Sequence, residues 1–333
     1  MLASPKSEFV TVTDIATFPE RLKGGVVAIG NFDGVHRGHQ AVLEAAREEA
    51  ARRNCPAFAM TFEPHPRTVF NPDKPVFRLT PPAAKARLMR ALGLDGLISV
   101  PFTRDFAAIE AQDFVDHILQ ENLHITHAVT GYDFHFGRAR RGTPDFLRAA
   151  GLSDDFGVTI VEAEKNEGGE TISSSRIRAA LAEGDIALAN ALLGYRWFFS
   201  ATVQHGDKRG RDLGYPTANL QLAPEADLAH GIYAVRVNID GQTHDGVASH
   251  GRRPTFDNGR PLFEVHVFDF SGDLYDREVE VTVAAYLREE RRFESAEALI
   301  EQMDRDSGEA RAAFASLQPL SPLDLALTAA GTP

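Results

Sequence analysis

The strongest constraint on the fold is a change in hydrophobic pattern near residue 197. From 26 to 193, apolar strand-like runs alternate with amphipathic helix-like runs, which predicts a parallel sheet covered by helices on both faces. From 197 onward, short alternating runs are separated by Gly, Asp and Pro turns, which predicts an antiparallel barrel or sandwich. We therefore expect two domains of different class, with the boundary between 188 and 196.

The predicted elements follow from the spacing of apolar residues. In the first half we expect strands at 26–30, 57–62, 97–102, 128–131 and 158–163, and helices after residue 40 (Val42, Ala46 and Ala50 at spacing four) and at 82–92, 114–123, 175–183 and 185–193. In the second half we expect strands at 198–204, 232–239, 263–270 and 278–286, and a helix at 294–316 with Leu299, Met303 and Phe314 on its apolar side. The last sixteen residues, 318–333, are poor in packing signals, so we expect a loosely ordered tail.

Composition narrows the class of protein. The chain has 333 residues, 43% hydrophobic and 25% charged, as in globular proteins. Its net charge is 35 − 47 = −12, which argues against a nucleic-acid partner but allows a local cluster of donors to bind ATP. The single cysteine, Cys55, excludes a disulfide framework. Without a membrane-length apolar run or a secretory pattern, we expect a cytoplasmic protein without a membrane partner.

The first chemical motif is Gly-Asn-Phe-Asp-Gly-Val-His-Arg-Gly-His at 30–39. It follows a strand, contains three glycines and opens a helix, an arrangement that presents free N–H groups to a phosphate. His36 and His39 would project to one side and stabilise charge on a phosphoryl group. The predicted phosphate-binding residues of this loop are Gly30, Asn31, Phe32, Asp33, Gly34 and Gly38. Two alternatives stay open: a purely structural turn, or a zinc site completed by His65.

These ten residues resemble the motif of the His-X-Gly-His nucleotidylyltransferases, in the long form of the flavin-adenylylating branch. Residues 62–66 (Phe-Glu-Pro-His-Pro), 131–137 and 172–178 agree with further segments of that branch in order and spacing. Asp133 departs from the usual Asn; a carboxylate can accept hydrogen bonds or bind Mg²⁺ but cannot donate. The resemblance implies that Asp133, Ser174, Ser175 and Arg178 bind the nucleotide, although serine caps and an exposed helical arginine are ordinary alternatives.

The second motif lies at 205–219, His-Gly-Asp-Lys-Arg-Gly-Arg-Asp-Leu-Gly-Tyr-Pro-Thr-Ala-Asn. Glycines among cations suggest a flap over phosphates, with Gly206, Lys208 and Gly210 as candidates, and a solvated hairpin as the alternative. Thr217 and Asn219 point the same way on an extended chain and offer oxygen ligands suited to Mg²⁺.

Gly-Tyr-Pro-Thr-Ala-Asn in this setting resembles riboflavin kinase, whose family fold is a six-stranded barrel. Segments at 230–233, 253–256, 263–266 and 272–275, and from Leu287 to Phe293, continue the resemblance; 248–251 and Asp276 depart from it. It implies that Glu264 is the general base that deprotonates the ribityl 5′-hydroxyl. An ordinary surface glutamate on a strand is the alternative.

Together the motifs cover residues 10 to 316 and resemble the prokaryotic bifunctional riboflavin kinase/FAD synthetase family. This implies an adenylyltransferase domain at 1–190, a kinase domain at 191–318 and a tail at 319–333. The expected reactions convert riboflavin and ATP to FMN and ADP, then FMN and ATP to FAD and pyrophosphate, both with Mg²⁺. Three rivals stay open: a kinase with an impaired adenylylating half, a non-enzymatic flavin- or nucleotide-binding regulator, and adenylylation of another phosphate ester. Oligomers are possible but are not predicted by the sequence.

Overall fold

The structure is a computed structural model that describes residues 8–205, 214–251 and 261–329. Contacts between Cα atoms divide the chain into two compact units, Met1–Ser174 and Ser175–Pro333. The division precedes residue 190, where we expect the domain boundary from sequence, so the helices at 175–193 pack with the second unit. None of the helices within the described ranges is both long and apolar enough to cross a membrane.

The first unit contains a parallel sheet, as predicted. Its strands lie in the order β1-β4-β3-β2-β5-β6, and every neighbouring pair is parallel. The strands are β1 (Val10–Val12), β2 (Val26–Ile29), β3 (Ala57–Glu63), β4 (Gly96–Pro101), β5 (His127–Gly131) and β6 (Gly157–Val161). Because all six run the same way, the loops that follow them meet at one edge of the sheet, where ligands bind in open α/β folds.

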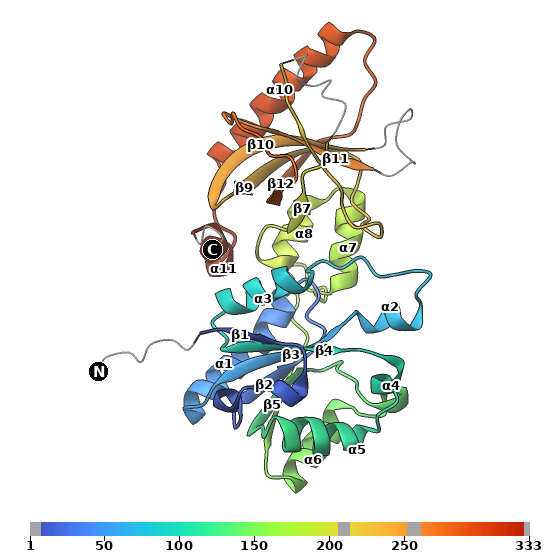
Figure 1. Cartoon of the computed structure of the whole chain (residues 1–333), viewed down its shortest axis with the longest axis vertical. Helices are drawn as coiled ribbons and strands as arrows, with labels where there is room; N and C mark the ends of the chain where they lie inside the picture. Colours follow the sequence, from blue (N-terminus) through green and yellow to red (C-terminus); the bar gives the residue numbers. More distant parts are fainter. Residues whose placement is uncertain (1–7, 206–213, 252–260, 330–333) are drawn as a thin grey trace, which may run out of the picture. The chain divides into compact units, whose positions relative to one another are not determined.

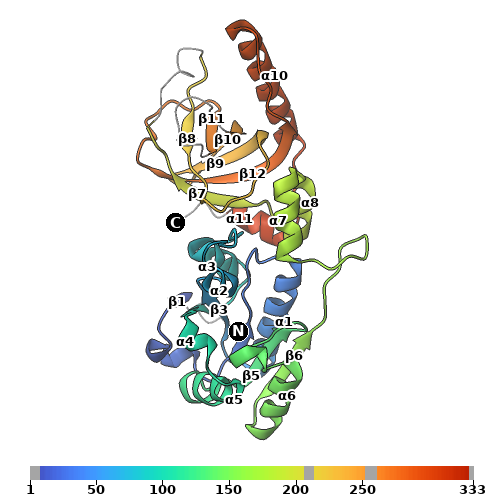
Figure 2. The same ribbon diagram turned by 90° about the vertical axis from the view of Figure 1, so that its right-hand side faces the viewer.

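Helices cover both faces of this sheet (Figures 1 and 2). They are α1 (Arg37–Arg53), α2 (Pro66–Phe70), α3 (Pro82–Ala91), α4 (Arg104–Ala107), α5 (Ala111–Asp113), α6 (Pro144–Ser153), the 3₁₀ turns at Ile15–Thr17, Glu20–Leu22 and Arg138–Arg140, and the π-helix η3 (Phe114–Asn122). Helix α1 buries Val42, Ala46 and Ala50, which confirms the predicted apolar side. An apolar cluster lies on the opposite face, where Phe114 and Leu119 of η3 and Leu147 of α6 pack against β2, β3 and β4.

The second unit is a six-stranded antiparallel half-barrel, which confirms the predicted fold class. Its strand order is β7-β12-β9-β10-β11-β8. The strands are β7 (Phe198–Thr202), β8 (Ala218–Leu220), β9 (Gly231–Ile239), β10 (Gln242–Gly251), β11 (Leu262–Val267) and β12 (Glu278–Arg288), and the helices are α7 (Ser174–Glu183), α8 (Ile186–Leu193), α10 (Ala296–Ala315) and α11 (Pro322–Ala329). Gln204, just after β7, bridges Asn219 of β8, so the two edge strands approach each other.

Helix α10 packs on this sheet. Its Ala310 and Phe314 are buried in one cluster with Ala234 and Phe268, whereas Leu299 and Met303 are only half-buried. Asp306 of α10 is also buried, and both its carboxylate oxygens accept hydrogen bonds from Arg288 of β12, at 2.7 and 2.6 Å. An ion pair therefore fixes the predicted C-terminal helix on the sheet, together with the apolar residues.

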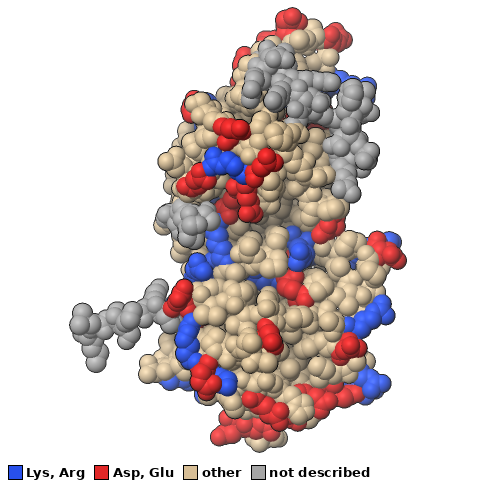
Figure 3. Space-filling view, in the orientation of Figure 1, with Lys and Arg blue, Asp and Glu red and all other residues tan. Residues whose placement is uncertain are grey.

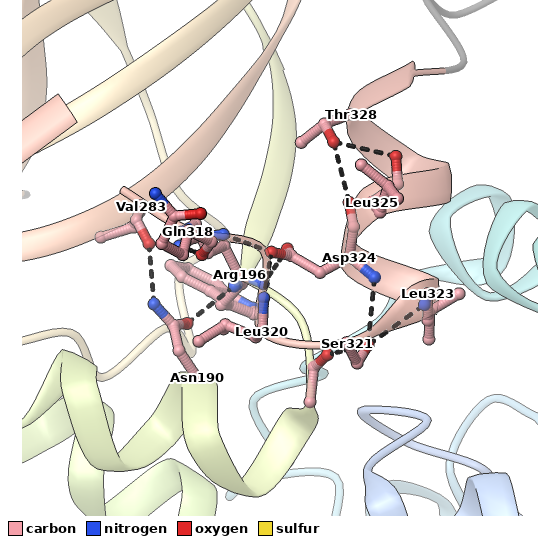
Figure 4. Close-up of polar contacts among 12 residues, drawn as sticks. Asn190, Arg196, Val283, Gln318, Leu320, Ser321, Leu323, Asp324, Leu325 and Thr328 are labelled. Carbon is pink, nitrogen blue, oxygen red and sulfur yellow. Dashed lines mark hydrogen bonds and ion pairs between the residues drawn. The ribbon is translucent and has the colours of Figure 1, made fainter. Parts of the chain in front are cut away.

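The C-terminal segment differs from our expectation of a loosely ordered tail, because it forms α11 and docks on the second unit (Figure 4). Asp324 is 2% exposed and pairs with Arg196, which is 7% exposed. The backbone N–H of Arg196 donates to Asp324 Oδ1 at 3.1 Å, and Ser321 Oγ donates to the Gly194 carbonyl at 2.6 Å. The segment is held by polar contacts to residues far away in sequence, which apolar periodicity does not detect.

Candidate active sites

The loop between β2 and α1 turns sharply because several of its residues have left-handed backbone. Phe32, Gly34 and Val35 have φ values of 48°, 89° and 37°. Burial compensates for the strain at the two non-glycine positions, since Phe32 and Val35 are 1% and 0% exposed. The loop therefore delivers the N-terminus of a 17-residue helix to the carboxyl edge of the sheet, an arrangement suited to binding an anion.

Asp33 organises this loop from within. Its Oδ1 accepts a hydrogen bond from Thr80 N at 3.1 Å, and its carbonyl accepts one from Ser174 Oγ at 2.7 Å. Thr80 Oγ1 in turn accepts from Gly34 N at 2.8 Å. The Asp33 carboxylate is 3% exposed and joins the loop to Thr80; its binding of phosphate stays a prediction. Ser174, another predicted phosphate ligand, is joined to the loop by its hydrogen bond to the Asp33 carbonyl.

His36 and His39 stack, with ring centroids 3.6 Å apart and an interplanar angle of 18°. His36 Nδ1 caps α1 by accepting from His39 N at 3.3 Å. Within the described ranges, no group forms a hydrogen bond with the buried Nδ1 atom of His39. Burial, then the neighbouring His36 and Lys85, lower the pKa of His39 well below its ordinary value. His39 is therefore neutral at pH 7, and such an imidazole donates a single hydrogen bond.

Several residues beside this loop were not identified from sequence. Lys85 of α3 is 2% exposed, and its ammonium contacts the Asn31 carbonyl, Thr61 Oγ1 and Glu63 Oε1 at 2.9, 3.0 and 2.8 Å. Glu63 also accepts from Arg78 at 2.7 Å. The sequence pattern that could have identified Lys85 is its position on the same side of the predicted helix as Leu88 and Met89, the side that is buried.

An aromatic cluster, which we had not predicted, follows the carboxyl ends of β3 and β4. Phe102 lies 6.0 Å from Phe62, 6.1 Å from Phe70 and 5.8 Å from Phe106, centroid to centroid. Phe70 is 61% exposed, so one ring of the cluster presents its surface to solvent. Aromatic groups at this edge offer a stacking surface for a flat ring system.

The other residues predicted for this site are placed as follows. Asp133 is exposed in the turn after β5, the strand beside β2. Ser175 is exposed and Arg178 half-buried on α7, in the second compact unit. His65, the residue considered as a third zinc ligand, caps α2 by accepting from Arg67 N at 3.1 Å.

The second candidate site lies on β8 and β11. Asn219 is directly opposite Glu264 in the antiparallel register, and Ser249 of β10 is opposite Glu264 on its other side. Side chains in such pairs share one face and have Cβ atoms about 4.5–5.5 Å apart. The register therefore brings together two predicted site residues that are far apart in sequence.

Asn219 has an unsatisfied oxygen at this position. The residue is 6% exposed, and no hydrogen-bond partner for Oδ1 occurs among the residues that the structure describes. The preceding segment is anchored to the same strand as Glu264, because His266 Nδ1 donates to the Pro216 carbonyl at 2.9 Å. Thr217 lies between Pro216, which this hydrogen bond anchors, and Asn219, which pairs with β11. The predicted phosphate ligands Gly206, Lys208 and Gly210, and the motif at 253–256, lie outside the described residues.

On the face drawn in Figure 3, acidic and basic side chains are interspersed. The groups suited to bind an anion at the first site are local: the loop N–H groups and the start of α1.

In the comparison with known proteins, two family models match separate parts of the chain. A family model described as FAD synthetase matches residues 18–176, and one described as riboflavin kinase matches residues 193–314. The bifunctional riboflavin kinase/FMN adenylyltransferase of Escherichia coli is 41% identical over 298 residues, covering 89% of this chain and 95% of that protein. The proteins of the same name from Pseudomonas fluorescens and Bacillus subtilis are 43% and 38% identical, over 87% and 88% of this chain and 93% of each relative.

The fold also agrees with a solved structure. A crystal structure described as a macrolide-efflux protein from Streptococcus pneumoniae has a TM-score of 0.81 and 32% sequence identity, covering 91% of this chain and 98% of that one. The similarity therefore extends over both units.

Proposed function

Because the chain belongs to the bifunctional riboflavin kinase/FMN adenylyltransferase family, we propose that it carries out these two reactions at two separate sites. The first unit adenylylates FMN to FAD, and the half-barrel phosphorylates riboflavin to FMN. One observation carries the proposal: the two family models match different units, and each unit holds its own set of candidate catalytic groups.

In the kinase reaction, Glu264 takes the proton of the ribityl 5′-hydroxyl as that oxygen attacks the γ-phosphorus of ATP, and ADP leaves. Its place opposite Asn219 supports this role, because it sets a carboxylate beside the candidate nucleotide and metal ligands. The buried, unsatisfied Oδ1 of Asn219 and the hydroxyl of Thr217 are hard oxygen donors that fit Mg²⁺. When bound there, the ion supplies positive charge that neutralises the phosphates.

In the adenylylation reaction, a phosphate oxygen of FMN attacks the α-phosphorus of ATP and pyrophosphate leaves. The loop N–H groups and the start of α1 bind phosphate, and His36 and His39 donate to oxygens on which charge develops. By family resemblance, Asp133 and, on α7, Ser175 and Arg178 are further predicted nucleotide ligands. The aromatic cluster around Phe102 is suited to the isoalloxazine ring, because flat conjugated rings stack on aromatic side chains.

The test is incubation of the protein with riboflavin, ATP and Mg²⁺, followed by chromatography of the flavins. FMN should appear first and FAD after it, and chelation with EDTA should stop both. His36→Asn should suppress FAD while FMN still forms. Glu264→Gln should block FMN from riboflavin while FAD still forms from supplied FMN.

The outcomes separate the alternatives. FMN without FAD would favour a kinase with an impaired adenylylating half, and Asp133→Asn would then show whether the carboxylate is the cause. The absence of both flavin nucleotides would favour a non-enzymatic binding protein. Loss of both activities in each variant, with the fold intact, would contradict the assignment of two sites.

A further inference from the structure

We propose that Lys85 is a positioning residue for FMN adenylylation: its buried ammonium holds the phosphate loop to the end of β3 and sets the electrostatics of the histidine pair. The inference rests on the proposed adenylyltransferase function of the first unit. Lys85 belongs to none of the motifs described above, and its helix, α3, lies outside the loop that it supports.

The geometry shows why Lys85 positions other groups and does not itself bind phosphate. A lysine ammonium has three donor hydrogens. Within hydrogen-bond distance of Nζ lie the Asn31 carbonyl at 2.9 Å, Thr61 Oγ1 at 3.0 Å and Glu63 Oε1 at 2.8 Å. All three hydrogens are therefore engaged, and at 2% exposure the side chain has little room to release one to a ligand.

The contacts connect two parts of the site. Asn31 belongs to the phosphate loop, whereas Thr61 and Glu63 lie on β3, the strand next to β2. Thr61 Oγ1 donates to the same Asn31 carbonyl at 2.8 Å, so this carbonyl is held from two sides. Fixing it fixes the peptide plane at the start of the loop, and with it the directions of the N–H groups that follow.

Charge is the second part of the argument. Glu63 pairs with both Lys85, at 2.8 Å, and Arg78, at 2.7 Å. Two cations and one carboxylate give 2 − 1 = +1, so the group carries a net positive charge beside a loop suited to an anion. The described titratable or charged groups that act on His39 are His36, stacked on it, and Lys85; both favour its neutral form.

Two variants test both parts. Lys85→Met removes the charge and the hydrogen bonds at similar length; Lys85→Arg keeps the charge but cannot reproduce the three short contacts. We expect kcat/KM for FAD synthesis from FMN to fall by about ten- to a hundredfold in both. The acid limb of the adenylylation pH profile should move to higher pH in Lys85→Met only, because loss of the positive charge raises the pKa of His39.

Riboflavin kinase activity of the same preparations is the control for the amount of active protein, since it resides in the other unit, and circular dichroism checks that the first unit is folded. Lys74→Met changes an exposed lysine nearby in sequence. The kinase rates of the Lys85 variants should match that of the wild type. Lys74→Met should synthesise FAD at the wild-type rate. Thr61→Val removes two hydrogen bonds, the one from Lys85 and the one to the Asn31 carbonyl, without changing charge, so it should lower the rate and leave the acid limb in place.

An unchanged rate or an unchanged acid limb in folded Lys85→Met would overturn the inference. If Lys85→Met does not fold, unchanged rates in both Lys85→Arg and Thr61→Val would overturn it. Absence of FAD from the wild-type protein would instead contradict the proposed function, so the two failures are distinguishable.

Discussion

At the scale of single residues, close contacts around the histidine pair decide which substitutions the first site tolerates. A Cβ atom at Gly38 would lie 3.3 Å from Cε1 and Nδ1 of His36, tighter than an ordinary contact. The His36 ring has little freedom to retreat, because it is 6% exposed and stacks on His39. Gly38 therefore provides space for an imidazole.

Gly38→Ala should displace the His36 ring and lower FAD synthesis from FMN by about tenfold. Stability should change little, because the helix preference of alanine over glycine, about 1 kcal/mol in a helix interior, offsets the cost of the tight contact. The measurement is the rate of FAD formation beside the midpoint of thermal unfolding. An unchanged rate would mean that the ring adjusts without cost to function.

A second prediction at this scale concerns pH. The folded protein holds the pKa of His39 below the ordinary value of 6.5, chiefly through burial. Below about pH 6.5 the unfolded chain binds a proton that the folded chain does not, so stability falls as pH decreases from there toward the lowered pKa. The buried His127, whose pKa burial also lowers, acts in the same direction.

His39→Asn should therefore weaken the fall in unfolding free energy of the first unit between pH 7 and pH 5. Circular dichroism in urea at several pH values measures it. His117→Asn is the matched control: this exposed histidine has a raised pKa through Glu121, so its loss should not weaken the fall. A fall of equal size in His39→Asn and the wild type would contradict the argument.

At the scale of elements, the buried ion pair between Arg196 and Asp324 holds helix α11 to the start of the half-barrel. Arg196 lies between α8 and β7, and it also donates to the Gln318 carbonyl at 2.7 Å. Removing the carboxylate of Asp324 would leave a buried guanidinium without its counter-charge. Such a change costs more than the ion pair contributes, because the remaining charge stays desolvated.

Asp324→Ala should lower the unfolding free energy of the second unit by about 3–5 kcal/mol. The only tryptophan of the chain, Trp197, is 1% exposed and adjoins Arg196, so its fluorescence in urea reports on this unit. Glu309→Ala, at an exposed position of α10, is the control and should have little effect. Replacing both partners, Arg196→Met with Asp324→Leu, should recover part of the loss; no recovery would mean that the pair is not the cause.

At the scale of the whole molecule, the candidate catalytic groups of the two reactions lie in two separate compact units. The histidine pair is built on a parallel sheet, and the Asn219–Glu264 register on an antiparallel one. Each unit has its own apolar core, so a point change at one site need not disturb the other.

A mixture of His36→Asn and Glu264→Gln proteins should therefore convert riboflavin to FAD, although neither variant does so alone. The first supplies FMN, which the second adenylylates after a lag that shortens as protein concentration rises. Chromatography of the flavins over time measures this. FMN without FAD in the mixture would mean that FMN does not pass between molecules.

Local pattern was sufficient for much of the fold and for part of both sites. Spacing predicted α1 with its buried Val42 and Ala46, and the phosphate loop with His36 and His39, because each of these features depends on residues close together along the chain. Strand β10 was missed because its segment is polar and it is a strand through pairing with β9 and β11. Helix α11 was missed because a distant arginine holds it.

The sequence alone thus determined the change of fold class near residue 197, the glycine-rich loop before a helix and the identity of the candidate catalytic groups. Only the tertiary structure decided that Asn219 lies opposite Glu264, that Asp33 joins its loop to Thr80, and that Lys85 is buried beneath Asn31. The physical reason is the distance along the chain between the residues that interact. Periodicity and turn chemistry are properties of neighbouring residues, whereas register, burial and charge pairing arise only when distant segments pack together.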